Sequence, residues 1–174
     1  MDDRIVRENR RSNLARRLIS HGVRTKIISA LTELTRNRQS TVRKRLAVRD
    51  KSRLRGPTKS SLELFLKTSR ARMEGAALGA LCEVFDIPIG PEAVALPAIV
   101  SLGFGERLCE TFEAYRACHP GTELALEELI LLRSSLAKGD EIRSVRCRGC
   151  RALMLVSPYE GTRRLCPHCV PPED

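Results

Sequence analysis

The most constraining feature of this sequence is a set of four cysteines near its C-terminal end. They form two Cys-x-x-Cys pairs, Cys147 with Cys150 and Cys166 with Cys169, separated by 15 residues. Such a pair places two sulfur atoms on one cation through a tight turn, and two pairs complete the tetrahedral four-sulfur shell that Zn²⁺ prefers. Because four protein ligands leave no open position for water or substrate, the spacing predicts one structural zinc ion.

Three other uses of these cysteines remain open on the spacing alone: a pair of disulfides, a thiol redox site, or a mixed metal site in which His168 replaces one cysteine. The intervening residues favour a zinc ribbon, because residues 152–156 have a strand-like pattern, residues 157–161 a turn pattern, and residues 162–165 that of a return strand. We therefore expect residues 141–174 to form a four-cysteine zinc-binding module built on a β-hairpin.

Basic residues are concentrated in the first third of the sequence. Residues 1–60 contain 18 Lys and Arg against 5 Asp and Glu, whereas residues 61–140 contain 7 against 12. A local excess dominated by arginine is typical of a surface that meets phosphates, in nucleic acid or on a membrane, although a solvated charged face has the same composition. We interpret the basic end as a binding surface for double-stranded DNA.

Short helices are predicted in this basic region. Apolar spacing indicates a first helix around residues 14–19, ended near Gly22, and a second over residues 23–32. Thr35 has the position of an N-cap for a third helix over residues 36–48, with Val42 and Leu46 facing inward. Two helices joined by a tight turn, the second rich in basic residues, are typical of a helix-turn-helix. Residues 1–59 are therefore predicted to form a basic, helix-turn-helix-like DNA-binding region.

The third of these helices supplies the predicted DNA contacts. Side chains in its first turn would read base edges, because Arg pairs with guanine and Asn or Gln with adenine through two hydrogen bonds. Basic side chains further along would bind phosphates, which fix the register without reading the sequence. The base-reading set is Arg36, Asn37, Arg38 and Gln39, and the phosphate-binding set is Arg43, Lys44 and Arg45.

The middle of the chain, residues 60–140, is predicted to be a helical core and partner-binding region. Periodicity indicates one long helix over residues 62–85, a helix around residues 108–115, and another over residues 122–138 that Gly139 ends. The predicted inner face of the long helix consists of Leu62, Leu66, Met73, Ala77, Leu81 and Val84. The expected fold class is therefore mainly α, with a helix-turn-helix-like unit at one end and a zinc-ribbon-like hairpin at the other.

Several classes of function are disfavoured by what the sequence lacks. The middle region has no nucleophile paired with a base and no glycine-rich phosphate loop, so we do not expect an enzyme. Residues 1–11 are charged rather than apolar, and the most apolar window, residues 87–104, is interrupted by proline, glycine and glutamate. We therefore expect neither a signal peptide nor a membrane span, and a cytoplasmic location.

Three stretches, taken in order, resemble the flagellar transcriptional activator subunit FlhC. Residues 14–24, LARRLISHGVR, are similar to the opening helix of that family with its L-I-x-x-G-[AV]-R element. Residues 28–38, ISALTELTRNR, are similar to its I-x-x-x-T-x-L-[ST]-R-x-R segment, and the two Cys-x-x-Cys pairs followed by Pro171-Pro172 are similar to its zinc-binding end.

The resemblance implies a cytoplasmic regulator that binds DNA at flagellar promoters of the class II type. It implies a hetero-oligomer with a partner subunit of the FlhD type, recruitment of RNA polymerase, and zinc bound by the four cysteines. The family usually has an apolar residue at the position of Gln39, a tyrosine near Arg43, and a tryptophan-containing segment after the Gly56-Pro57 connector, whereas this sequence contains no tryptophan. The resemblance therefore implies the fold more directly than it implies the target promoters.

A second hypothesis is a zinc-ribbon adaptor that binds RNA or another protein without reading a DNA sequence. Aromatic residues make up only 3% of the chain, which leaves few platforms for stacking unpaired bases and disfavours recognition of single strands.

Overall fold

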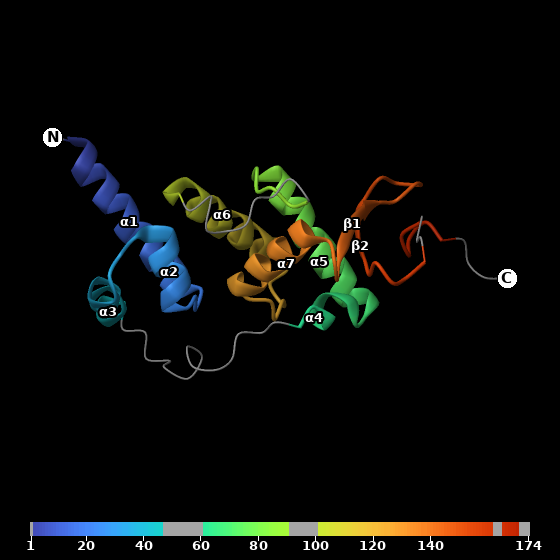
Figure 1. Ribbon diagram of the computed structural model, residues 1–174, viewed down its shortest axis with the longest axis horizontal. Coiled ribbons are helices and arrows are strands. Elements are labelled where there is room, and N and C mark those ends of the chain that lie inside the picture. The colour runs from blue at the N-terminus through green and yellow to red at the C-terminus, as the bar shows by residue number, and fades with distance from the viewer. Residues whose placement is uncertain (1, 47–60, 91–100, 162–164, 171–174) are drawn as a thin grey trace. The chain divides into compact units, whose positions relative to one another are not determined.

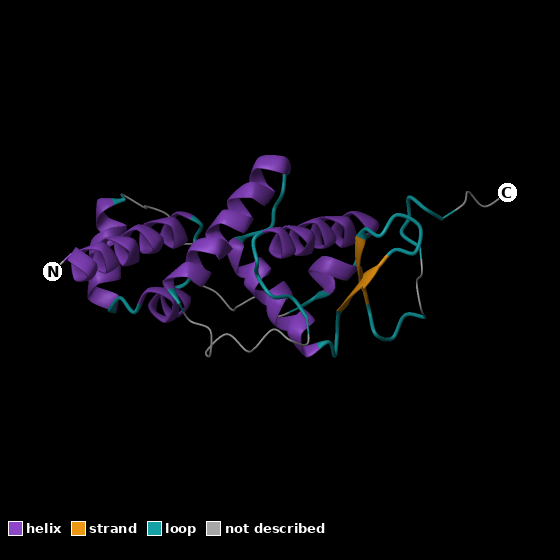
Figure 2. Ribbon diagram, turned by 90° about the horizontal axis from the view of Figure 1, so that it is seen from above, coloured by secondary structure: helices purple, strands orange, loops and turns teal. Residues whose placement is uncertain are grey.

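The computed structural model describes residues 2–46, 61–90, 101–161 and 165–170. These residues form seven helices and one two-stranded antiparallel sheet (Figures 1 and 2). The predicted mainly helical class with a small C-terminal sheet is confirmed. In chain order the elements are α1 Asp2–Ser20, α2 Thr25–Thr32, α3 Arg36–Arg45, α4 Glu63–Leu66, α5 Ser69–Val84, α6 Leu102–Cys118, α7 Leu126–Lys138, β1 Arg143–Arg146 and β2 Leu153–Val156.

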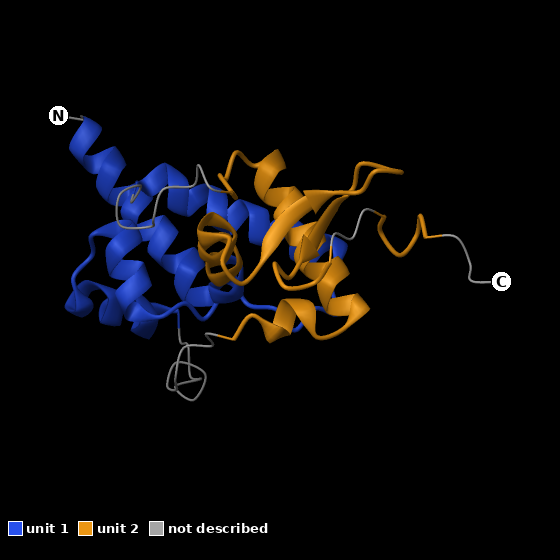
Figure 3. Ribbon diagram, turned by 45° about the vertical axis from the view of Figure 1, so that its right-hand side comes forward, with its two compact units in different colours: residues 1–59, 95–129 blue, residues 60–94, 130–174 orange. Residues whose placement is uncertain are grey.

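Two compact units divide the chain, and neither is continuous in sequence (Figure 3). Unit 1 contains Met1–Lys59 and Ala95–Leu129, and unit 2 contains Ser60–Val94 and Ile130–Asp174. Unit 1 therefore holds α1, α2, α3 and α6, whereas unit 2 holds α4, α5, β1 and β2. The sequence analysis divided the chain by function into residues 1–59, 60–140 and 141–174. That functional division remains a prediction.

The core of unit 1 forms where α1 and α2 pack against α6. Leu14 and Leu18 of α1 are at most 1% exposed, as is Leu108 of α6. Gly105 lets the helices approach closely, because a Cβ atom there would lie 2.7 Å from Leu14 Cδ2 and 3.5 Å from Leu31 Cβ. The predicted apolar stripes of these helices are confirmed as the core of the unit.

Ion pairs join α1 to α6 beside this core. Arg10 donates to Glu106 at 2.6 Å, and Arg17 donates to Glu113 at 2.7 Å. His21, just after α1, lies 2.9 Å from the same carboxylate of Glu113. The partner arginine holds the pKa of Glu106 and of Glu113 below the ordinary glutamate value. Unit 1 therefore carries carboxylates whose ionised form is stabilised by folding.

The helix boundaries in unit 1 follow the local sequence signals. Gly22 adopts φ 71° after α1, and the hydroxyl of Thr35 accepts a hydrogen bond from the backbone N–H of Arg38, as expected of an N-cap. The third helix ends at Arg45 rather than near residue 48, which lies outside the described residues. Val42 and Leu46 are only half-buried, because α3 buries Gln39 instead.

The long helix predicted over residues 62–85 is wrong, because the chain forms the short helix α4 and then α5. Thr68 separates them, and its side chain accepts a hydrogen bond from the backbone N–H of Ala71 to begin α5. This restart changes the buried face, so that Met73 and Val84 are 58% and 72% exposed. The residues that α5 buries are Gly75, Leu78, Gly79 and Cys82.

The small sheet pairs β1 with β2 in antiparallel register, from Arg143 opposite Val156 to Arg146 opposite Leu153. The sequence correctly placed the strand over Leu153–Val156, but it missed β1 as its partner. Residues 162–164 of the expected return strand lie outside the described residues. The inner face of β2 packs on α5, where a Cβ atom at Gly75 would lie 2.6 Å from Leu155 Cδ1.

Candidate metal centre and basic helix

The four cysteines of the two Cys-x-x-Cys pairs converge on one point of unit 2. Cys147 and Cys150 lie in a turn that connects β1 and β2. Cys166 and Cys169 lie in a second turn, which follows β2 in the sequence. All four sulfur atoms lie within 4.8 Å of one another, and the sulfurs of Cys150 and Cys166 are 3.7 Å apart. A tetrahedral shell with Zn–S bonds of about 2.3 Å places its sulfurs roughly 3.8 Å apart. The cluster therefore has the dimensions of a site that holds a metal ion.

Both cysteine pairs are held by the same kind of turn. The backbone N–H four residues after the first cysteine of each pair donates to the carbonyl of that cysteine, from Arg151 to Cys147 at 2.9 Å and from Val170 to Cys166 at 3.0 Å. The turns are linked because the backbone N–H of Cys166 donates to the sulfur of Cys147 at 3.3 Å. Gly149 leaves room for the second turn, since a Cβ atom there would lie 3.0 Å from the sulfur of Cys169.

The backbone of these turns also favours a thiolate. The N–H groups of Cys150 and Cys166 lower the pKa of the Cys147 thiol to about 6, because hydrogen bonds to the charged form stabilise it. Close contact with the sulfurs of Cys150 and Cys166 raises the pKa of Cys169 to about 12. Four thiolates at this distance repel one another, and a divalent cation is the charge that would let them coexist.

His168 does not take part in the convergence. Its ring is exposed, and the clustered ligand atoms among the described residues come from the four cysteines. The geometry thus supports the all-cysteine set over the mixed set that includes His168.

The predicted DNA contacts on α3 fall into an exposed group and a buried group. Arg36, Asn37, Arg38, Lys44 and Arg45 are exposed. Arg38 forms an ion pair with Glu8 of α1, and 63% of its side chain remains exposed. The exposed side chains lie at both ends of α3, with Arg36, Asn37 and Arg38 in its first turn and Lys44 and Arg45 in its last turn.

Gln39 and Arg43 are less exposed than their predicted roles in DNA binding require. Gln39 is only 1% exposed, and its amide donates to Ser29 Oγ at 2.7 Å and to the carbonyl of Leu34 at 3.0 Å. Arg43 is half-buried, donates to the carbonyl of Val23 at 3.3 Å, and has its pKa lowered by burial. Both side chains fasten α3 to the rest of unit 1, so they are not presented to a base or a phosphate as predicted.

The connection between α2 and α3 is three residues long and tightly hydrogen-bonded. Glu33 adopts the left-handed conformation with φ 58°, and its N–H donates to the carbonyl of Ser29 at 2.8 Å. The backbone N–H of Leu34 then donates to Thr32 Oγ1 at 3.2 Å. The carboxylate of Glu33 pairs with Arg11 of α1. A non-glycine residue in this conformation costs energy, and the surrounding hydrogen bonds offset that cost.

Two concave features were not predicted from the sequence. An apolar groove of about 420 Å³ runs along unit 2, lined by Ala76 and Ala80 of α5, Leu153 and Leu155 of β2, and Cys166. A polar cleft of about 540 Å³ lies in unit 1, lined by residues of α1 and by Arg38 of α3. The small residues of α5 and the spacing of the arginines in α1 are the signals that point to these features.

No protein-family model and no curated protein matches this sequence. Within the described residues, no helix combines the length and the apolar character needed to cross a membrane.

Proposed function

We propose that this chain is a DNA-binding transcriptional activator of the FlhC type with one structural zinc ion. In this proposal it acts in the cytoplasm at flagellar class II-type promoters, in a hetero-oligomer with an FlhD-type subunit, and recruits RNA polymerase. It is not an enzyme. The four cysteines hold the zinc, and α2 and α3 act as a helix-turn-helix.

The observation that carries the proposal is the exposed basic surface of α3 immediately after a tight three-residue turn. A recognition helix contacts base edges with its N-terminal residues and phosphates with its flanks. Arg36 and Asn37 are exposed in the first turn of α3, and Lys44 and Arg45 are exposed near its end. We therefore assign base reading to Arg36, Asn37 and Arg38, and phosphate binding to Lys44 and Arg45. We leave Gln39 and Arg43 out of this assignment, because Gln39 is buried and Arg43 is half-buried.

The test compares substitutions in the two groups on one selected DNA site. Arg36→Ala should reduce discrimination between the selected site and its single-base variants by about 1–3 kcal/mol. Lys44→Ala should weaken binding to all sequences alike, because phosphates carry no sequence information. Arg116→Ala, an exposed arginine on α6, is the control and should change neither quantity. Unchanged discrimination by Arg36→Ala would contradict the assignment of α3 as a recognition helix.

The second candidate is the zinc-ribbon adaptor that binds RNA or protein. The observation that favours it is a pair of exposed arginines, Arg148 and Arg151, beside the cysteine cluster, for which the described residues provide no ion pair. Competition of structured RNA with duplex DNA decides between the two. Displacement of DNA by equimolar RNA of similar length would favour the adaptor, and retention of DNA would favour the activator.

A further inference from the structure

The inner face of α1 changes character halfway along the helix. Arg4, Arg7, Arg11, Leu14 and Leu18 follow one another at spacings of three and four residues, so they share one helical stripe. The two leucines are at most 1% exposed and belong to the core of unit 1. The three arginines continue the same stripe beyond the core, toward the start of the helix. Here α1 therefore presents guanidinium groups where its second half presents apolar side chains.

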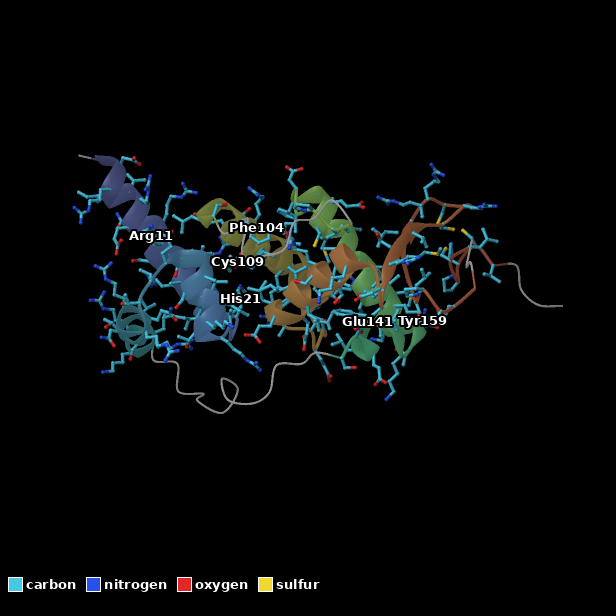
Figure 4. The ribbon with its side chains drawn as sticks, in the orientation of Figure 1. Arg11, His21, Phe104, Cys109, Glu141 and Tyr159 are labelled. Carbon is cyan, nitrogen blue, oxygen red and sulfur yellow. The ribbon has the colours of Figure 1, made fainter. Side chains whose placement is uncertain are left out.

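This arginine stripe and α3 enclose the polar cleft of unit 1. The cleft has a volume of about 540 Å³, and Figure 4 marks Arg11, which lies at its inner end on α1. Its lining side chains are Asp3, Arg4, Arg7, Glu8, Arg11 and Arg38. Four guanidinium groups thus share the cleft with two carboxylates, and a third carboxylate, that of Glu33, pairs with Arg11. One positive charge remains in excess. The excess of positive charge favours an anion.

The carboxylates do not use all the hydrogen-bond donors of the cleft. Glu8 pairs with Arg38 and lies 4.0 Å from Arg11, and Asp3 lies 3.8 Å from Arg7. Arg11 also pairs with Glu33, from the connection between α2 and α3. Arg11 Nε is nevertheless buried with no hydrogen-bond partner among the described residues, and those residues provide no ion pair for Arg4. Each guanidinium offers five N–H donors in a planar fork that matches the oxygens of a phosphate. The cleft therefore contains more hydrogen-bond donors than acceptors to pair with them.

We infer that this cleft binds a phosphate group of the DNA backbone, an inference that rests on the proposed DNA-binding function. Arg38 connects the cleft to the first turn of α3, so a phosphate held there lies beside the bases that Arg36 and Asn37 would read. Glu8, which pairs with Arg38 in the cleft, repels the phosphate. The cleft adds α1 to the DNA-binding surface and sets the register of α3 without reading sequence.

The test measures the affinity of the full chain for random-sequence duplex DNA at several salt concentrations. Arg4→Gln and Arg7→Gln should each lower the affinity several-fold and reduce the slope of log K against log salt by about 1. Arg16→Gln is the matched control, because Arg16 is an exposed arginine of α1 that does not line the cleft. Glu8→Gln should raise the affinity more than Glu123→Gln, which removes an exposed carboxylate elsewhere in unit 1.

The outcomes separate this inference from the proposed function. Equal effects of Arg7→Gln and Arg16→Gln, or of Glu8→Gln and Glu123→Gln, would overturn the phosphate cleft and leave the role of α3 intact. Loss of affinity for structured RNA but not for duplex DNA in Arg7→Gln would overturn it as well. The cleft variants could lose affinity while the wild type shows no preference among sequences. That result would support phosphate binding in the cleft and contradict the proposed sequence-selective activator. A wild-type chain that binds no duplex DNA would contradict both.

Arg4 and Arg7 are exposed, so their replacement should leave the thermal unfolding temperature unchanged and the comparison free of folding defects. Discrimination between the selected site and its variants should also stay constant, because a phosphate contact weakens all sequences equally.

Discussion

Gln39 shows how burial changes what a polar side chain can do. From its place in α3 it is predicted to read adenine, yet its amide bonds Ser29 and the carbonyl of Leu34 inside unit 1. Gln39→Ala removes both bonds and leaves a cavity, so the free energy of unfolding should fall by about 1–3 kcal/mol. Urea denaturation measures this change. Wild-type stability together with lost DNA discrimination would contradict the structural role and restore the reading role.

Gly75 and Gly103 offer a matched pair of single substitutions. A Cβ atom at Gly75 would lie 2.6 Å from Leu155 Cδ1 and 3.0 Å from Phe65 Cδ1, both in buried side chains. Gly75→Ala should therefore destabilise the chain by about 1–3 kcal/mol through overpacking, in excess of the roughly 1 kcal/mol gain in helix propensity. At Gly103 the nearest atom is Arg107 Nη1 at 3.8 Å, so Gly103→Ala should be neutral or stabilising. Thermal unfolding that ranks the two variants in the opposite order would contradict this packing.

We expect the hairpin of β1 and β2, with the two cysteine turns beside it, to depend on a bound metal ion more than the other elements do. The turns are short, and their sulfurs are the groups that join them. Protein purified without added zinc should contain one zinc per chain, and chelation should unfold this element, seen as rapid hydrogen exchange in residues 143–156. Cys166→Ser should lose the metal, whereas Cys118→Ser, an exposed cysteine outside the cluster, should keep it. Metal-free protein with disulfides between these cysteines would instead indicate a redox site.

Some elements could be predicted from the sequence because their signals are local. The cap at Thr35, the turn at Gly22 and the spacing of the cysteines each depend on a few neighbouring residues. Other elements depend on contacts that the sequence does not display. Strand β1 is mostly basic and polar, so only its pairing with β2 identifies it as a strand. The buried face of α5 contains two glycines, which an apolar pattern does not count, and this is why the wrong stripe was predicted.

The candidate site residues also include some with local sequence signals and some that depend on tertiary contacts. The four clustered cysteines could be predicted because the Cys-x-x-Cys spacing is typical of a tight turn. The exposure of side chains on α3 could not, because it depends on which face packs against α1 and α2. The arginine cleft was missed for a related reason, since Arg38 joins it from a segment distant in sequence.

The distribution of charge over the chain predicts how its stability changes with pH. Glu106 and Glu113 pair with Arg10 and Arg17, and the pKa of each carboxyl is lowered from 4.5. A lowered folded-state pKa contributes stability that is present above the ordinary value and is lost as the pH falls through the folded value. The unfolding temperature should therefore drop below about pH 4.5, and Glu113→Gln should flatten this drop. Parallel curves for the wild type and Glu113→Gln would contradict a role of this pair, and Glu123→Gln is the control.

The measurement that tests the central claim most directly is selection of genomic DNA fragments by the purified full chain, alone and co-expressed with an FlhD-type subunit. Salt should be near 0.15 M (roughly physiological), where non-specific binding is weak. The account predicts recovery of a common site that the partner strengthens. Uniform, salt-sensitive recovery of all fragments, unchanged by the partner, would contradict it.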